Sequence, residues 1–153
     1  TTAGALISNQ IGAGEQRCLF KTCGMTLKLT YAILIPLLMI LCLFPELVLR
    51  TFTDSPSLIA ASVNSVYVMA SSTLIMAPSF ILFNAVSGTG NTKAGFIMEM
   101  ISLAVYTAVI YYGIIRLKPD VALCWFSEHV YGVTLITLAW WYLKSGKWRG
   151  KKV

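Results

Sequence analysis

Residues 55–92 read SPSLIAASVNSVYVMASSTLIMAPSFILFNAVSGTGNT and contain no charged side chain. Ser55-Pro56 fits a helix start, with a capping residue followed by proline at the first helical position. The run SGTGN at 87–91 contains the residues that end helices. We therefore predict a helix over 56–86, longer than the roughly 20 residues that cross a bilayer. Pro78 lies inside it and predicts a kink, which a bundle tolerates where a neighbour satisfies the freed carbonyl group.

The composition of the whole chain agrees with this prediction. Hydrophobic residues make up 57% of the 153 residues and charged residues only 12%, with a mean hydropathy of +0.74. Soluble domains carry about 25% charged residues. The chain is therefore expected to be a membrane protein with room for four or five spans and for no separate soluble domain.

The remaining spans follow from where charges are absent and where helix breakers fall. Further spans are expected at 25–44, at 93–115 and at 121–143. Residues 1–14 read as the end of a preceding helix, and residues 144–153 form a basic tail. The predicted fold class is all-α integral membrane protein, with four transmembrane helices plus the end of a fifth in a single membrane region, 1–153.

The distribution of positive charge predicts the orientation. Placing the tail in the cytoplasm puts nine of the 12 lysines and arginines inside and leaves Arg50, Arg116 and Lys118 outside. This is the bias of the positive-inside rule. We predict a multi-pass protein of the cell inner (plasma) membrane with a cytoplasmic carboxy terminus. The net charge of +6 is then explained by topology and lipid contact, and no nucleic-acid partner is expected.

Two boundary segments invite their own interpretation. Trp140, Trp141, Tyr142 and Trp148 are expected to form an interfacial aromatic belt. The outer connection PELVLRTFTDSP, residues 45–56, fits either a short amphipathic turn along the interface or an ordinary loop. The amino terminus lacks the charged region of a signal peptide and does not begin with Met, so we interpret the chain as part of a longer protein.

Two glycine pairs lie at expected cytoplasmic helix ends. One is Gly12 with Gly14, and the other is Gly88 with Gly90, next to Asn91. The first lacks the third glycine of a dinucleotide site, and the second lacks the Lys-Ser/Thr step of a phosphate loop. We interpret both as helix ends, where glycine permits positive φ and close helix contact.

These motifs together resemble the multidrug and toxic compound extrusion (MATE) transporters. The resemblance rests on Gly12-Ala13-Gly14-Glu15, on the loop from Pro45 to Asp54 and on Gly88-Thr89-Gly90-Asn91-Thr92. It implies two six-helix lobes around a central cavity, of which this chain supplies the carboxy-terminal part of the second lobe. The expected function is that of a fragment of a cation-coupled multidrug efflux antiporter, inactive alone and exporting small amphipathic organic substrates.

The resemblance also implies the partners and the ion. The missing first lobe and the membrane lipid are the expected partners, and Na⁺ or H⁺ is the expected coupling ion, with no other cofactor. Relatives are thought to hold the cation with carboxylates on the seventh and tenth helices. The helix expected at 56–86 would match the tenth, and it contains no Asp or Glu.

Two carboxylates inside expected spans are the candidates for coupling. Glu99 and Glu128 would be costly to bury unpaired, so they are expected to face the bundle interior. At 1.5 Å per residue, Glu99 lies about 9 Å from the inner helix end and Glu128 about 12 Å from the outer end. In a hydrocarbon core about 30 Å thick, their depths differ by about 10 Å. We therefore expect two separate polar points, with Glu99 as the coupling carboxylate.

Polar stripes on the same helices provide candidate cavity-lining residues. Helical spacing places them on common faces, some beside the two glutamates. The candidates are Asn64, Ser71, Ser72, Ser102, Tyr106 and Tyr131. Such stripes also arise from close helix packing, which is the favoured interpretation for the serines.

One other class of function stays open, that of a small integral membrane assembly or regulatory subunit. It would have its own start codon, whereas a transporter gene would encode further helices upstream of Thr1. No enzyme is expected, because no nucleophile, base and orienting group recur at a common depth. The four cysteines form no C-x-x-C pair and are expected to act as small apolar side chains without a metal.

Overall fold

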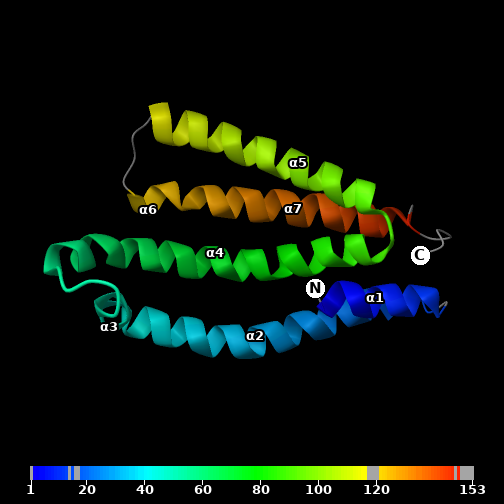
Figure 1. Cartoon of the computed structure of the whole chain (residues 1–153), viewed down its shortest axis with the longest axis horizontal. Helices are drawn as coiled ribbons and strands as arrows, with labels where there is room; N and C mark the ends of the chain where they lie inside the picture. Colours follow the sequence, from blue (N-terminus) through cyan, green and yellow to red (C-terminus); the bar gives the residue numbers. More distant parts are fainter. Residues whose placement is uncertain (1, 14, 16–17, 117–120, 147, 149–153) are drawn as a thin grey trace.

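The computed structural model describes residues 2–13, 15, 18–116, 121–146 and 148 (Figure 1). Every regular element in this part of the chain is a helix. The bounds are α1 Thr2–Gly12, α2 Leu19–Leu43, α3 Pro45–Arg50, α4 Pro56–Gly88, α5 Thr92–Val109, a π-helical segment Ile110–Arg116, α6 Val121–Cys124 and α7 Phe126–Ser145.

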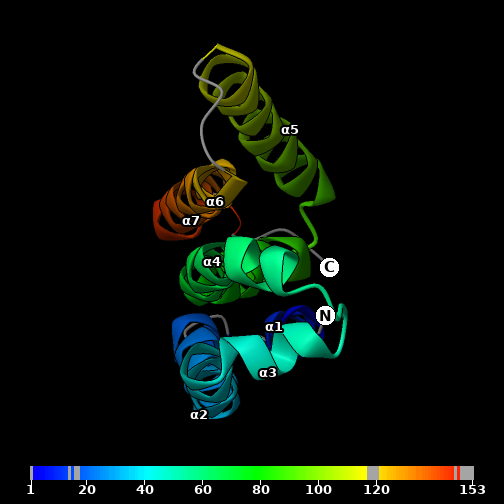
Figure 2. The ribbon, with the colours of Figure 1, turned by 90° about the vertical axis from the view of Figure 1, so that its left-hand side faces the viewer.

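Helix α4 lies in the middle of the bundle. Helices α1 and α2 pack on one side of it, α7 packs on the other, and α5 packs on α7 (Figures 1 and 2). α3 lies across the end of the bundle where α2 ends and α4 begins. The α5–α7 pair therefore lies on the far side of α4 from α2.

Several helix ends differ from the expected ranges. α2 begins at Leu19 rather than at residue 25. Leu19 and Cys23 are buried, so the packed face of this helix includes residues before the expected start. α4 runs to Gly88, two residues past the expected end at 86. The span expected at 121–143 is divided at Trp125 into α6 and α7, and α7 ends at Gly146, whose φ of 67° forms a left-handed cap.

Three helices in the described part are long and apolar enough to cross a membrane: Leu19–Leu43, Pro56–Gly88 and Thr92–Gly113. The most apolar window of α2 has 0% of its residues buried inside the protein. An apolar surface of this kind is typical of a helix that contacts lipid. Helix α7 is not among the three, and it carries Glu128, His129 and Lys144. The fourth span therefore stays a prediction.

Pro78 in α4 has a specific partner on α2. Proline has no backbone N–H, so it cannot bond the carbonyl oxygen four residues earlier, that of Leu74. The hydroxyl of Tyr31 donates to this oxygen at 2.7 Å. A neighbouring helix thus satisfies the group that proline leaves unbonded.

Glycine lets two pairs of helices approach closely, backbone to backbone between α1 and α4 and backbone to side chain between α7 and α4. A Cβ on Gly88 would lie 2.5 Å from the carbonyl oxygen of Gly4, so α1 and α4 touch there without side chains. A Cβ on Gly132 of α7 would lie 2.9 Å from Ile75 of α4. At the same contact Ser79 donates to the carbonyl oxygen of Gly132 at 3.0 Å. Small residues therefore set the spacing of α4 from both neighbours.

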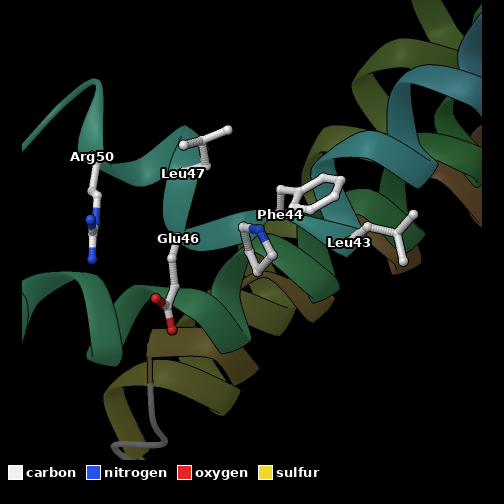
Figure 3. Close-up of a pocket in the computed structure, with 6 residues that line it drawn as sticks. Leu43, Phe44, Glu46, Leu47 and Arg50 are labelled. Atoms are coloured by element: carbon white, nitrogen blue, oxygen red, sulfur yellow. The ribbon is translucent and has the colours of Figure 1, made fainter.

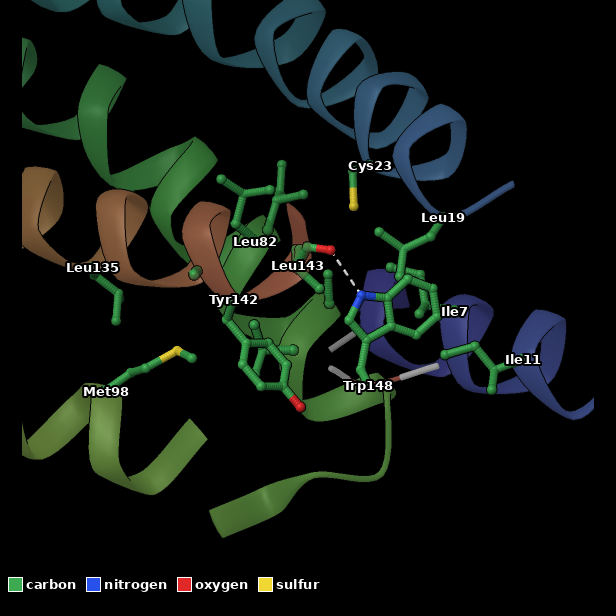
Figure 4. Close-up of a cluster of buried hydrophobic side chains, with 14 residues drawn as sticks. Ile7, Ile11, Leu19, Cys23, Leu82, Met98, Leu135, Tyr142, Leu143 and Trp148 are labelled. Carbon is green, nitrogen blue, oxygen red and sulfur yellow. Dashed lines mark hydrogen bonds between the residues drawn. The ribbon is translucent and has the colours of Figure 1, made fainter. Parts of the chain in front are cut away.

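The buried core gathers at the end of the bundle where both termini lie (Figure 4). Trp148 is 1% exposed and sits among Ile7, Leu19 and Leu143. Its Nε1 donates to the carbonyl oxygen of Leu143 at 2.8 Å.

The expected aromatic belt is therefore wrong for two of its members. Trp148 and Tyr142 are buried, with Tyr142 only 9% exposed, because α1 and α2 cover this end of the bundle. Trp140 and Trp141 are exposed on the surface of α7.

Candidate functional site

Helices α5 and α7 exchange two tyrosine–glutamate hydrogen bonds. The hydroxyl of Tyr131 on α7 donates to Oε1 of Glu99 on α5 at 2.5 Å. The hydroxyl of Tyr106 on α5 donates to Oε1 of Glu128 on α7 at 3.1 Å. We call these four residues the Glu–Tyr cluster. Each helix supplies one acceptor and one donor, so both carboxylates are satisfied across the interface.

The two tyrosine rings of the Glu–Tyr cluster touch each other. Their centroids are 5.9 Å apart with an interplanar angle of 76°, an edge-to-face contact. The ring contact connects the two hydrogen-bonded pairs. The four side chains therefore form a continuous row from Glu99 through Tyr131 and Tyr106 to Glu128.

The two carboxylates are held by different tyrosines, and the expectation of two separate polar points stays a prediction. The estimate from helix rise placed the carboxylates about 10 Å apart in depth, and the structure gives no direct bond between them among the described residues. The tyrosine side chains extend across this interval. An estimate made from backbone positions alone does not include their reach.

Ser102 supplies a buried polar atom beside the Glu–Tyr cluster. It lies three residues after Glu99 and four before Tyr106, so all three share one face of α5. Its side chain is 0% exposed, and its Oγ has no hydrogen-bond partner in the described structure. A buried hydroxyl without a partner is costly and is a candidate ligand for an ion or a water molecule.

The cavity-lining candidates on α4 do not join this cluster. Ser72 is 6% exposed and donates to the carbonyl oxygen of Met69, so it is a packing residue. Asn64 and Ser71 are exposed. Ser71 lines a cavity of about 320 Å³ between α2 and α4, whose lining is nearly all apolar. The six predicted lining residues therefore do not surround one cavity. Ser102, Tyr106 and Tyr131 lie at the α5–α7 interface, whereas the three candidates on α4 lie outside it.

His129 connects α7 to α4. Its Nε2 lies 2.9 Å from Oγ of Ser71, and its ring stacks on Phe126 with centroids 5.0 Å apart. Its Nδ1 is buried and has no partner among the described residues. The sequence offered no signal for this bond, because the two residues are 58 positions apart.

The residues of the glycine motifs have distinct structural roles. Gly90 has a φ of 76°, which ends the turn after α4. Asn91 caps α5 by accepting from the backbone of Ala94, and its Nδ2 donates to the hydroxyl of Tyr142 at 2.6 Å. A Cβ on Gly12 would meet nothing within 4 Å. Gly14 lies outside the described residues.

The described residues hold no group of three or more His, Cys, Asp or Glu side chains that could bind a metal ion. Cys18, Cys23, Cys42 and Cys124 are free thiols. The polar groups at the α5–α7 interface are carboxylate, phenol and hydroxyl oxygens.

The fold and this interface define a polytopic membrane protein with ionisable side chains between its helices. Among protein families, the MatE family model matches residues 1–112. The chain belongs to this family, the multidrug and toxic compound extrusion transporters, and the resemblance seen in the sequence is confirmed. Neither a search of curated proteins nor a search of solved structures gave a match. Members of the family are transporters rather than enzymes.

The matched range contains only half of the Glu–Tyr cluster. Glu99 and Tyr106 lie within residues 1–112, whereas Glu128 and Tyr131 lie beyond them. The family match therefore includes the residues that α5 supplies to the interface. The part of α7 in this interface is supported by the geometry alone.

Proposed function

We propose that this chain is the carboxy-terminal part of a cation-coupled efflux antiporter, with Glu99 as the coupling carboxylate. The observation that carries the proposal is the Glu–Tyr cluster, which places two carboxylates between membrane helices of a MATE-family chain. The exported substrates would be small amphipathic organic molecules, and the coupling ion would be Na⁺ or H⁺.

The role of Glu99 follows from its surroundings. When the carboxylate is charged, the hydroxyl of Tyr131 stabilises it by a charge-assisted hydrogen bond. When a proton or a sodium ion binds, the charge is neutralised and the need for this bond falls. Ion binding therefore changes how strongly α7 is held to α5, which is the kind of local change that can bias two arrangements of a lobe.

Glu128 and Ser102 extend this role to the rest of the interface. Glu128 is the second coupling candidate, since Tyr106 holds it in the same manner as Tyr131 holds Glu99. The Oγ of Ser102 supplies an unoccupied oxygen ligand one turn from Glu99. An ion bound near Glu99 would gain this ligand at no loss of an existing bond.

The topology belongs to the same proposal. Helix α7 would be the fourth span, with the basic tail in the cytoplasm and the protein in the inner membrane. The first lobe would be supplied by further helices encoded upstream of Thr1. The chain would not transport alone, because alternating access needs one lobe to move against the other.

The experiment is a substitution of the carboxylate in the transporter that contains this sequence. Glu99→Gln removes the charge while keeping the shape, and efflux of a fluorescent amphipathic cation is followed in membrane vesicles. Glu15→Gln, at an exposed position outside the cluster, is the matched control. We expect Glu99→Gln to abolish ion-driven efflux and the control to retain it. Unchanged efflux in Glu99→Gln would remove Glu99 from the coupling role.

A second readout separates the two ions. Efflux driven by an imposed sodium gradient is compared with efflux driven by an imposed pH gradient of equal size. The gradient that drives export in the parent protein and fails in Glu99→Gln identifies the ion that this carboxylate binds.

A further inference from the structure

The connection between α2 and α4 forms a surface at the end of the bundle. Phe44 leaves the helical conformation with φ −128° and ψ 52°, and Pro45 starts α3 in a new direction. Helix α3 therefore lies across the bundle end (Figures 1 and 2). The first part of the connection is thus a short helix, Pro45–Arg50, and its position along a membrane interface stays a prediction.

Two neighbouring cavities open beside α3, and both are lined by Glu46 and Arg50. One has a volume of about 400 Å³ and is completed by Leu43, Phe44, Pro45 and Leu47. The other has a volume of about 410 Å³ and is completed by Asp54, Pro56, Ile59 and Ala60. The first adds only apolar side chains and the second adds a carboxylate, so the pair of cavities is amphipathic.

The surface carries two charged side chains on α3. Glu46 and Arg50 are four residues apart on α3 and point to the same side of it, whereas Leu47 points away (Figure 3). Both side chains line the two cavities. Both charges therefore face the cavities and are open to a ligand that carries the opposite charges.

Three large apolar side chains around the first cavity are exposed. Leu43 is 67% exposed, Phe44 is 56% exposed and Leu47 is 68% exposed. In a membrane protein such side chains at the bundle end are expected to contact acyl chains.

We propose that α3 binds the headgroup of a phospholipid that carries a primary ammonium group. The phosphate would bind Arg50, which matches phosphate geometry with its paired N–H donors. The ammonium would donate to Glu46 and Asp54, and an acyl chain would lie along Leu43 and Phe44. This site is independent of the Glu–Tyr cluster and goes beyond the proposed transport function.

The chemistry of the surface distinguishes this lipid from others. A headgroup with net negative charge would be repelled by the two carboxylates, Glu46 and Asp54. A choline headgroup carries the same positive charge but has no N–H to donate to them. The primary ammonium combines the charge with hydrogen-bond donors, so it satisfies both carboxylates.

The test uses the purified membrane protein that contains this sequence. Retained lipid is measured by native mass spectrometry after exchange with phosphatidylethanolamine, phosphatidylcholine or phosphatidylglycerol of identical acyl chains. We expect about tenfold stronger retention of the ethanolamine lipid, the effect of one additional charge-assisted hydrogen bond. Arg50→Gln should lower retention of all three lipids, because each has a phosphate. Glu46→Gln should diminish the preference for ethanolamine over choline, because only Asp54 then remains to accept from the ammonium.

The controls are exposed charges away from α3. Lys93→Gln is the control for Arg50→Gln, and Glu15→Gln is the control for Glu46→Gln, and both should keep the preference. If Arg50→Gln does not fold, Arg50→Lys decides, since it keeps the charge without the paired donors and should bind with reduced strength. Stronger retention of phosphatidylglycerol, or an undiminished preference in Glu46→Gln, would overturn the proposal. Loss of efflux in Glu99→Gln has no bearing on either result.

Discussion

The rings of Tyr106 and Tyr131 meet edge to face with centroids 5.9 Å apart, and each hydroxyl donates to a glutamate on the opposite helix. This relationship connects the only two glutamates of α5 and α7 without bringing their carboxylates together. A change in the charge of Glu99 therefore alters its bond to Tyr131. The ring of Tyr131 packs on Tyr106, which is the donor to Glu128.

Removing the hydroxyl of Tyr131 should expose the cost of leaving Glu99 without its donor. We expect Tyr131→Phe to lower the free energy of unfolding by about 1 kcal/mol, the range of interhelical hydrogen bonds in membranes. Ion-driven efflux should fall as well, because the carboxylate loses its orientation. Tyr67→Phe, at an exposed position of α4, is the matched control. Thermal unfolding in detergent and vesicle efflux measure the two effects, and equal behaviour of both variants would contradict the role of this bond.

The contact between α1 and α4 should not tolerate a methyl group. Gly88→Ala would place Cβ 2.5 Å from the carbonyl oxygen of Gly4, so the backbone of one helix must move. We expect a loss of about 1–3 kcal/mol in stability, as for other overpacked contacts. Gly24→Ala meets nothing within 4 Å and should be neutral or stabilising by up to about 1 kcal/mol. Thermal unfolding of the two variants side by side would refute the contact if both behaved alike.

The bond between Tyr31 and the carbonyl oxygen of Leu74 should matter only while Pro78 is present. Tyr31→Phe should cost about 1 kcal/mol in the parent protein, because the freed carbonyl loses its donor. In the Pro78→Ala background, the restored backbone N–H bonds this oxygen and the cost should vanish. A double-mutant cycle on unfolding free energies measures this coupling. Equal costs in both backgrounds would show that Tyr31 does not compensate for the proline.

Composition and periodicity predicted much of the fold. The helical class and the start of α4 at Pro56 follow from the uncharged stretch and its capping residues. The need for a partner at Pro78 was also predictable, because the missing N–H is a property of the residue. Which side chain supplies the donor was not, since Tyr31 is 43 positions from Leu74, whose carbonyl oxygen it bonds.

The sequence predicts the four residues of the Glu–Tyr cluster, but it does not predict which of them bond each other. The cost of burying a carboxylate indicates Glu99 and Glu128. Helical spacing indicates Tyr106 and Tyr131. Their pairing depends on how far α5 and α7 are shifted along each other, which periodicity within one helix does not contain. Trp148 was misplaced for a similar reason, because its burial depends on where α1 and α2 lie relative to the end of α7.

We infer that Glu99 and Glu128 act as one unit through the two tyrosines. The most direct test compares Glu99→Gln, Glu128→Gln and the double variant in ion-driven efflux by the transporter that contains this sequence. We expect the double variant to lose no more activity than the more damaging single variant, because each substitution disables the same unit. Losses that multiply independently in the double variant would show two separate sites and would contradict this inference.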